Sequence, residues 1–274
     1  MSKNRKRKDR SYKLFVVMFV VLGAANVQAQ QQQSAEELAK KLANPIASLI
    51  SVPFQNNTDY GIGEYNGSRN TMNIQPVVPF GLSPKLNLIT RYILPIITQN
   101  NITGAGTKQS GLSDAVVSGF FSPANSKKGF TWGAGPIFLV PVATNDYLGT
   151  EKFGIGPTAV ALKQSKGWTV GALINQIWSV AGSSNREDVN QMFLQPFIVY
   201  NFKSGAGIGG NSEITANWQG NSTTAYLNLF ISAVTKLGNQ TIQVLVGPRV
   251  PLAAPEGGKP DFGWRAQLVF LFPR

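Results

Sequence analysis

Residues 261–274 read DFGWRAQLVFLFPR, and apolar side chains occupy every second position of this stretch. Arg265 and Gln267 stand in the alternate series, between the aromatic and aliphatic residues. Alternation with period two is the pattern of a β-strand, whose successive side chains point to opposite faces. An apolar face opposite a face that carries a guanidinium fits a membrane barrel wall, with lipid outside and water inside. The residues expected to face lipid, and to form part of the signal read by the barrel-assembly machinery, are Trp264, Leu268, Phe270 and Phe272.

The same alternation continues through most of the chain and predicts an all-β fold. The expected strands are 48–56, 70–81, 85–97, 112–123, 130–140, 153–164, 167–180, 190–202, 207–218, 224–236, 240–250 and 262–272. Most have roughly nine to thirteen residues, the length that a tilted strand needs to cross a bilayer, whereas strands of soluble proteins average about five or six. The sequence therefore predicts an antiparallel transmembrane β-barrel of about 12 strands.

The expected connections alternate in length. Tight turns are expected at 81–84, 124–129, 165–166, 203–205 and 238–239, and longer loops at 57–69, 98–111, 141–152, 181–189 and 251–261. Short turns at one end and long loops at the other are typical of an outer-membrane barrel. A soluble β-sandwich also alternates, but it places its apolar face inside and frequent charge on its surface.

Charged and polar residues of the alternate series are expected to line the lumen. This set comprises Lys85, Arg91, Asp114, Glu213, Tyr226, Gln243, Arg249, Arg265 and Gln267. Asp114 and Glu213 are the only acids inside expected strands, so at least one interior arginine should pair with one of them. Such residues set ion preference or bind a solute in some pores. The alternative is a structural network that fills and stiffens a narrow barrel.

The N-terminus resembles a secretory signal. Residues 1–13 form a basic segment, residues 14–25 are apolar but too short to span a bilayer, and Val27-Gln28-Ala29 ends like a cleavage site. We expect residues 1–29 to be a signal peptide, with a membrane anchor as the alternative. The chain after residue 29 keeps 18 basic and 12 acidic residues, a net charge of +6. This balance is too mild for a nucleic-acid protein, so no nucleic-acid partner is expected.

A short helix is expected before the barrel, within a polar segment at 30–47. Ser34 and Glu37 form a capping box, and Asn44-Pro45 ends the helix. The expected organisation is thus a signal peptide at 1–29, this periplasmic segment at 30–47, and the barrel at 48–274.

The chain contains neither His nor Cys. Their absence excludes Ser-His-Asp triads, His- or Cys-based zinc sites, disulfides and thiolate chemistry. We expect no catalytic, metal or cofactor site, and hence no enzyme. The run at 205–210 fits G-x-G-x-x-G, but a strand pattern follows it, whereas a nucleotide loop opens a helix.

Several segments resemble a bacterial outer-membrane barrel family labelled transporter or phenol-degradation MetA-pathway-like, some members of which carry the label "neuromedin U". The resemblance extends from about residue 44 to 218 and rests on NPIASLISVPFQNN, NIQPVVPFGLSPKLNLITRYILPI, GLSDAVVSGFFSP, WGAGPIFLVPVATN, LGTEKFGIGPTAV and GWTVGALINQIWSVAG. It implies an outer-membrane barrel that takes up small molecules, and it brings no agreed substrate and no site residues.

Two functions follow as hypotheses. The first is a passive outer-membrane channel or transporter for small solutes, including apolar or aromatic ones, in a Gram-negative bacterium. The second is a structural or surface-interaction barrel with a plugged lumen, acting through loops 57–69 and 98–111. In both cases the expected surroundings are outer-membrane lipid and lipopolysaccharide.

Overall fold

A computed structural model describes residues 33–125 and 127–272, so the expected signal peptide lies outside the described residues. The helix is α1 (Ala35–Leu42). The strands are β1 (Ile50–Ile62), β2 (Gly67–Ile74), β3 (Val77–Ser83), β4 (Leu86–Asn100), β5 (Lys108–Leu112), β6 (Ala115–Pro123), β7 (Phe130–Val140), β8 (Lys152–Ser165), β9 (Trp168–Gly182), β10 (Asn190–Asn201), β11 (Ala206–Asn217), β12 (Ser222–Leu237), β13 (Gln240–Ala253) and β14 (Phe262–Phe272).

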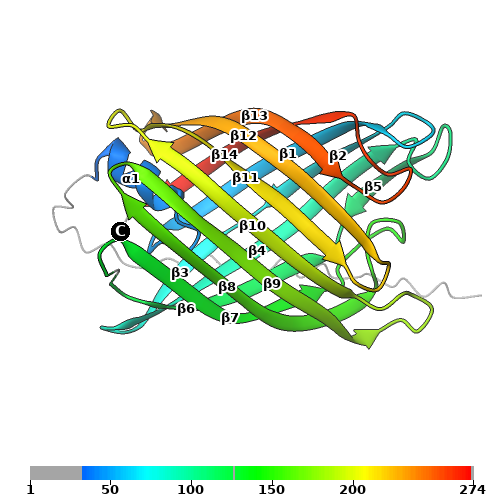
Figure 1. Cartoon of the computed structure of the whole chain (residues 1–274), viewed down its shortest axis with the longest axis horizontal. Helices are drawn as coiled ribbons and strands as arrows, with labels where there is room; N and C mark the ends of the chain where they lie inside the picture. Colours follow the sequence, from blue (N-terminus) through cyan, green and yellow to red (C-terminus); the bar gives the residue numbers. More distant parts are fainter. Residues whose placement is uncertain (1–32, 126, 273–274) are drawn as a thin grey trace, which may run out of the picture. The chain divides into compact units, whose positions relative to one another are not determined.

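The strands form one closed antiparallel sheet (Figure 1). Each wall strand pairs with its neighbours along the chain, and β14 returns to pair with β1 from Ile50↔Phe272 to Tyr60↔Phe262. Closure removes the free sheet edges, which is the condition for a sheet to stand in lipid. The predicted barrel is therefore confirmed.

Two wall strands are each broken into two segments. β2 and β3 are separated at Gln75-Pro76, and both pair with β4. Proline has no N–H to donate to the ladder, and Pro76 instead accepts a hydrogen bond from the Tyr92 N–H at 3.0 Å. β5 and β6 are separated at Ser113-Asp114 and also run along β4. Counted as wall strands, the segments give the expected twelve.

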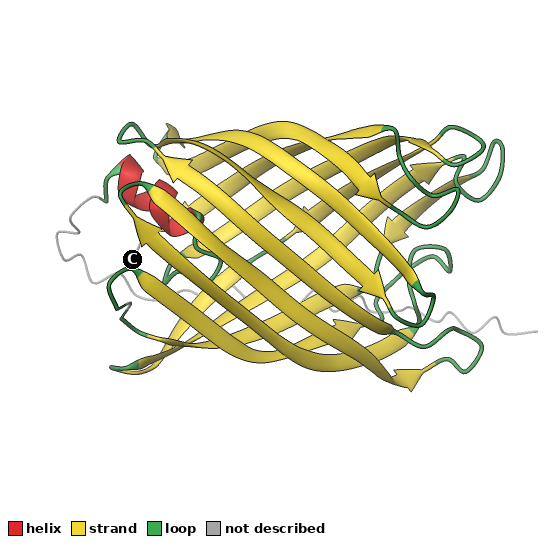
Figure 2. Ribbon diagram, viewed as in Figure 1, coloured by secondary structure: helices red, strands yellow, loops and turns green. Residues whose placement is uncertain are grey.

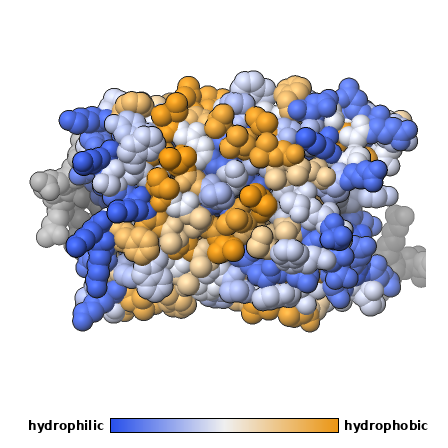
Figure 3. All heavy atoms as spheres, in the orientation of Figure 1, coloured by the Kyte–Doolittle hydropathy of each residue, from blue (hydrophilic) through white to orange (hydrophobic). Residues whose placement is uncertain are grey.

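The faces of β14 divide as the alternation predicts. Trp264 is 52% exposed on the outer face, whereas the adjacent Arg265 is 2% exposed inside the barrel. Figure 3 shows apolar residues across the middle of the visible face and hydrophilic residues toward both ends. All five tryptophans are exposed, four on wall strands and Trp218 directly after β11, with Trp132 and Trp168 near one end and the others near the opposite end. Aromatic residues at both borders of an apolar belt are typical of membrane barrels.

The connections differ at the two ends of the barrel, but the first long loop was wrongly predicted. Residues 57–69 mostly continue β1 and β2, leaving a four-residue hairpin at 63–66. Its Gly and Asn residues suggested a loop, yet Asp59 pairs with Arg69 in the ladder, and Tyr60 stacks on Phe262 at 5.1 Å. The short-turn end carries the turns after β3, β6, β8, β10 and β12, whereas the long-loop end carries this hairpin and the loops 101–107, 141–151, 183–189, 218–221 and 254–261.

Helix α1 begins and ends where the sequence predicts. The Glu37 N–H donates to the Ser34 hydroxyl, the Glu37 carboxylate accepts from the Ser34 N–H, and Leu42 is the last helical residue. Figure 2 shows the helix at the short-turn end. No helix among the described residues is long and apolar enough to cross a membrane.

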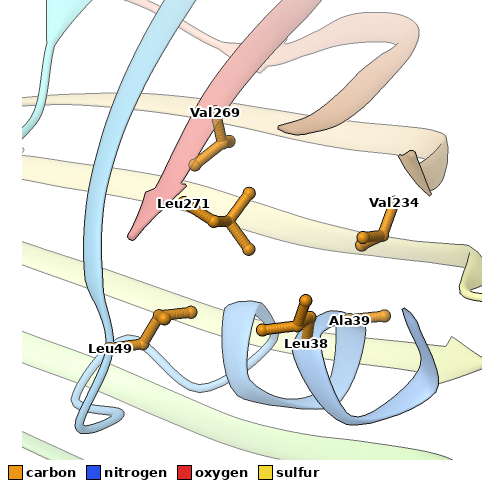
Figure 4. Packing of buried hydrophobic residues seen from close by; sticks show 6 residues of the cluster. All are labelled: Leu38, Ala39, Leu49, Val234, Val269 and Leu271. Atoms are coloured by element: carbon orange, nitrogen blue, oxygen red, sulfur yellow. The ribbon is translucent and has the colours of Figure 1, made fainter. Parts of the chain in front are cut away.

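The helix occupies the barrel interior. Leu38 and Ala39 pack with Leu49 against Val269 and Leu271, which belong to the inward series of β14 (Figure 4). Buried Val234 of β12 completes this cluster. The expected rule of polar residues inside is therefore wrong at this end of the barrel, because the inward side chains here meet a helix rather than water.

A second apolar cluster faces the first across the interior. Ile46, which follows the helix, packs against Ile89, Phe120 and Leu173 on the opposite wall. Residues 34–49 therefore pack against opposite parts of the wall at the short-turn end of the barrel.

The apolar belt on the outer face predicts that a charged substitution lowers the free energy of unfolding by an amount that depends on its depth in the bilayer. Leu268 lies midway between Trp264 and Phe272, so Leu268→Arg should lower the free energy of unfolding in lipid vesicles by about 2–4 kcal/mol. Phe272→Arg, at the border of the belt, should cost about 0–1 kcal/mol. Urea titration of both variants checks this, and equal costs would contradict the assigned position of the belt.

Candidate functional site

A carboxylate held by two arginines lies inside the barrel. Arg249 Nη1 donates to Glu213 Oε2 at 2.6 Å, and Arg265 Nη2 donates to Glu213 Oε1 at 2.7 Å. The three side chains come from β13, β11 and β14, and those of the arginines are at most 10% exposed. The ion pair expected between an interior arginine and an interior acid is thus present, and Glu213 serves both cations.

Further polar groups extend this network to β1 and β12. Arg249 Nε donates to Asp59 Oδ1 at 3.2 Å, and Arg265 Nε donates to Asn57 Oδ1 at 2.8 Å. Asn228 Oδ1 also accepts from Arg249 Nη1, at 3.1 Å. A charged group inside a barrel needs partners for its donors and acceptors, and here each guanidinium donates from two of its three nitrogens.

Four more of the residues expected in the lumen lie on the interior side of their strands. The Tyr226 ring lies 3.5 Å beneath the Arg249 guanidinium, a cation–π contact. Gln243, Gln267 and Arg91 line a cavity beside the network.

Lys85 and Asp114 are placed differently from the prediction. Lys85 stands in the two-residue turn between β3 and β4 and is exposed, because the strand begins only at Leu86. Asp114 lies at the break between β5 and β6, and its Oδ2 accepts bonds from the N–H and the hydroxyl of Thr150, both at 2.6 Å. It therefore anchors loop 141–151 and pairs with none of the arginines in the described part of the chain.

Asp59 and Asn57 are site residues that the sequence reasoning missed, because residues 57–69 were assigned to a loop. The signal was available in the inward series, in which Gln55, Asn57 and Asp59 alternate with outward neighbours. The alternation of polar and apolar residues is lost near the long-loop end, because Asn56 and Thr58 are polar on the outer face as well. These two side chains and Asn70 hydrogen-bond to one another, so their polar groups are satisfied on the outer face.

Ion pairs hold the loops at the long-loop end of the barrel. Lys152 Nζ lies 2.8 Å from Asp188 Oδ1, and the Ser179 hydroxyl donates to the same oxygen at 3.1 Å. The Lys152 and Ser179 bonds lower the pKa of Asp188. The charged form of Asp188 is favoured, so this tie persists at neutral pH and is lost only as the pH falls through the lowered pKa.

The cavity lies between the network of charged residues and residues 34–49, which pack inside the barrel. Its volume is about 190 Å³, and residues 39–49 form one side of it. Barrel strands contribute the aromatic rings of Phe197 and Phe230 and several amides. Among the described residues no cluster of three or more acidic side chains is suited to hold a metal ion.

Comparison with known proteins gives likeness of fold. No protein-family model matches the chain. No curated protein matches it either. The chain is similar to the crystal structure of an outer membrane channel from Pseudomonas putida F1, with 16% identity, a TM-score of 0.64, and coverage of 82% of this chain and 94% of that one. At this identity the likeness shows the barrel fold alone.

Two further solved structures are more distant. Outer membrane phospholipase A from Escherichia coli has 10% identity, a TM-score of 0.45, and coverage of 88% of this chain and 98% of that one. The translocator domain of the autotransporter NalP from Neisseria meningitidis has 10% identity, a TM-score of 0.46, and coverage of 86% and 93%. Similarity at this level carries no argument about function.

Removing the charge of Glu213 should destabilise the barrel strongly. Glu213→Gln leaves Arg265 without a carboxylate and Arg249 with only Asp59, and breaking a buried pair in this way costs about 3–5 kcal/mol. The free energy of unfolding from urea titration in vesicles measures this loss. Glu187→Gln, at an exposed loop acid, is the matched control and should stay within about 0.5 kcal/mol of the native chain. A loss below about 1 kcal/mol for Glu213→Gln would show that the network is not a stability element.

Proposed function

We propose that the protein is a bacterial outer-membrane channel that passes small solutes, including apolar or aromatic ones, and that residues 34–49 close its short-turn end. One observation carries the proposal. The wall is a complete closed sheet, whereas residues 34–49 belong to no strand of that wall and are held inside its short-turn end by side-chain packing. A closure that is not part of the wall can leave without opening the barrel.

Three features support the membrane part of the proposal. The apolar belt with aromatic borders suits a bilayer, the barrel is closed, and its fold is like that of a protein described as an outer membrane channel. The motifs between residues 44 and 218 favour the transporter family named above. We further propose export through a cleaved signal peptide at 1–29, assembly by the barrel-assembly machinery, and a setting of outer-membrane lipid and lipopolysaccharide in a Gram-negative cell.

The short-turn end then faces the periplasm. The chain enters the barrel at this end, and both α1 and the last residues of β14 lie there (Figure 1). Short periplasmic turns and longer outer loops are the usual arrangement in this class.

The packing of the segment also favours the second candidate, a structural or surface-interaction barrel with a permanently plugged lumen. Leu38 and Ile46 are buried on opposite walls, and the Gln164 amide donates to the Lys40 carbonyl oxygen at 2.8 Å. In that case the exposed hairpin 63–66 and loop 101–107 would be the interaction elements. We propose no enzymatic activity and no cofactor, because the chain has no His or Cys and few interior acid–base groups.

Displacing residues 34–49 from the barrel interior distinguishes the channel from the permanently plugged barrel. Leu38→Asp places a carboxylate in the apolar cluster, so the helix should leave its site and the open fraction in planar-bilayer recordings should rise severalfold. Lys40→Ala alters an exposed side chain of the same helix and should behave like the native chain. Conductance that is absent in the native protein and in Leu38→Asp alike would reject the channel and favour the plugged barrel.

A further inference from the structure

The cavity beside the network has an unbalanced charge. Of the residues that the structure describes, three cationic side chains line it, those of Lys41, Arg91 and Arg265, and no Asp or Glu does. Arg265 is already neutralised by Glu213 at 2.7 Å. The excess positive charge therefore comes from Arg91 and Lys41.

Arg91 has unused hydrogen-bonding capacity. Its Nη2 donates to Gln75 Oε1 at 2.8 Å, and no carboxylate of the described residues comes within 4.0 Å of its guanidinium. A guanidinium carries five donors in a fork that fits the two oxygens of a carboxylate. The nearest acid of the network, Glu213, already accepts from two other arginines.

The rest of the cavity offers apolar walls and one unsatisfied amide. Phe197 and Phe230 contribute aromatic rings, and Leu245 adds an aliphatic surface. Asn201 is 3% exposed, and neither its amide nitrogen nor its amide oxygen has a partner among the described residues. A buried amide without partners is costly, so a molecule that supplies a polar atom here would bind favourably.

We infer that this cavity is a binding site for a small organic carboxylate with an apolar body, with Arg91 as its anion-binding residue. The carboxylate takes the free donors of Arg91, the body lies against the two phenylalanine rings, and a further polar group reaches Asn201. The inference rests on the proposed channel function and names the class of solute that the channel would take. A volume of about 190 Å³ limits the ligand to a small molecule.

Benzoate is a suitable probe, with benzyl alcohol as its uncharged counterpart of similar shape. Isothermal titration calorimetry on the folded native barrel in detergent should show saturable binding of benzoate and at least tenfold weaker binding of benzyl alcohol. Arg91→Gln should weaken benzoate binding at least tenfold and leave benzyl alcohol binding unchanged. The control is Arg69→Gln, since Arg69 is also an arginine inside the wall with an amide partner, Gln99 at 3.0 Å, but does not line the cavity.

Each outcome decides the assignment. Equal binding of benzoate to the native chain and to Arg91→Gln overturns it, as does an equal loss in Arg69→Gln. If Arg91→Gln does not fold, Arg91→Lys replaces it, and that variant must weaken benzoate binding while still preferring benzoate over the alcohol. Absence of benzoate binding in a conducting barrel overturns the site alone, whereas binding without conductance in any variant overturns the proposed channel alone.

Discussion

The pleat of a closed sheet assigns each wall residue to one of two environments, and the rest of the structure depends on this constraint. Pairing from Ile50↔Phe272 to Tyr60↔Phe262 joins the last strand to the first, so no edge is free to shift independently. A slip by one residue would bring Arg265 to the outer face and Trp264 inside, reversing the environments of both. The apolar belt and the interior network are therefore two consequences of one register.

The interior uses this register in two different ways. In one region, inward polar residues from β1, β11 and β12 converge on Arg249 and Arg265, and Glu213 joins the two cations. Near the short-turn end the inward residues are apolar and pack on residues 34–49. The cavity lies between these regions, and of its three cations Arg265 belongs to the network, Lys41 to residues 34–49 and Arg91 to β4. The proposed solute site and the proposed closure of the lumen thus share side chains, among them Ala39, Leu49 and Val269.

The sequence predicts the strands of the barrel wall better than it predicts the arrangement of residues inside the barrel. Period two identifies strands and faces because burial acts on every second residue, and the capping box identifies α1 for a similarly local reason. The location of α1 depends on contacts between Leu38 and residues about 200 positions away, such as Val234, which no local pattern contains. Asp59 was missed because polar residues stand on both faces near the long-loop end, and Asp114 was misplaced because its partner, Thr150, lies in a loop.

Tethering the segment tests the channel and its closure together. The chain has no Cys, so a pair introduced at Ala39 and Val234, which share one buried cluster, would form the sole disulfide. Under oxidising conditions single-channel recordings should show no openings, because α1 cannot leave, and a reducing agent should restore the openings of the Cys-free protein. Equal conductance before and after reduction, with the disulfide verified by mass, would contradict closure of the lumen by residues 34–49.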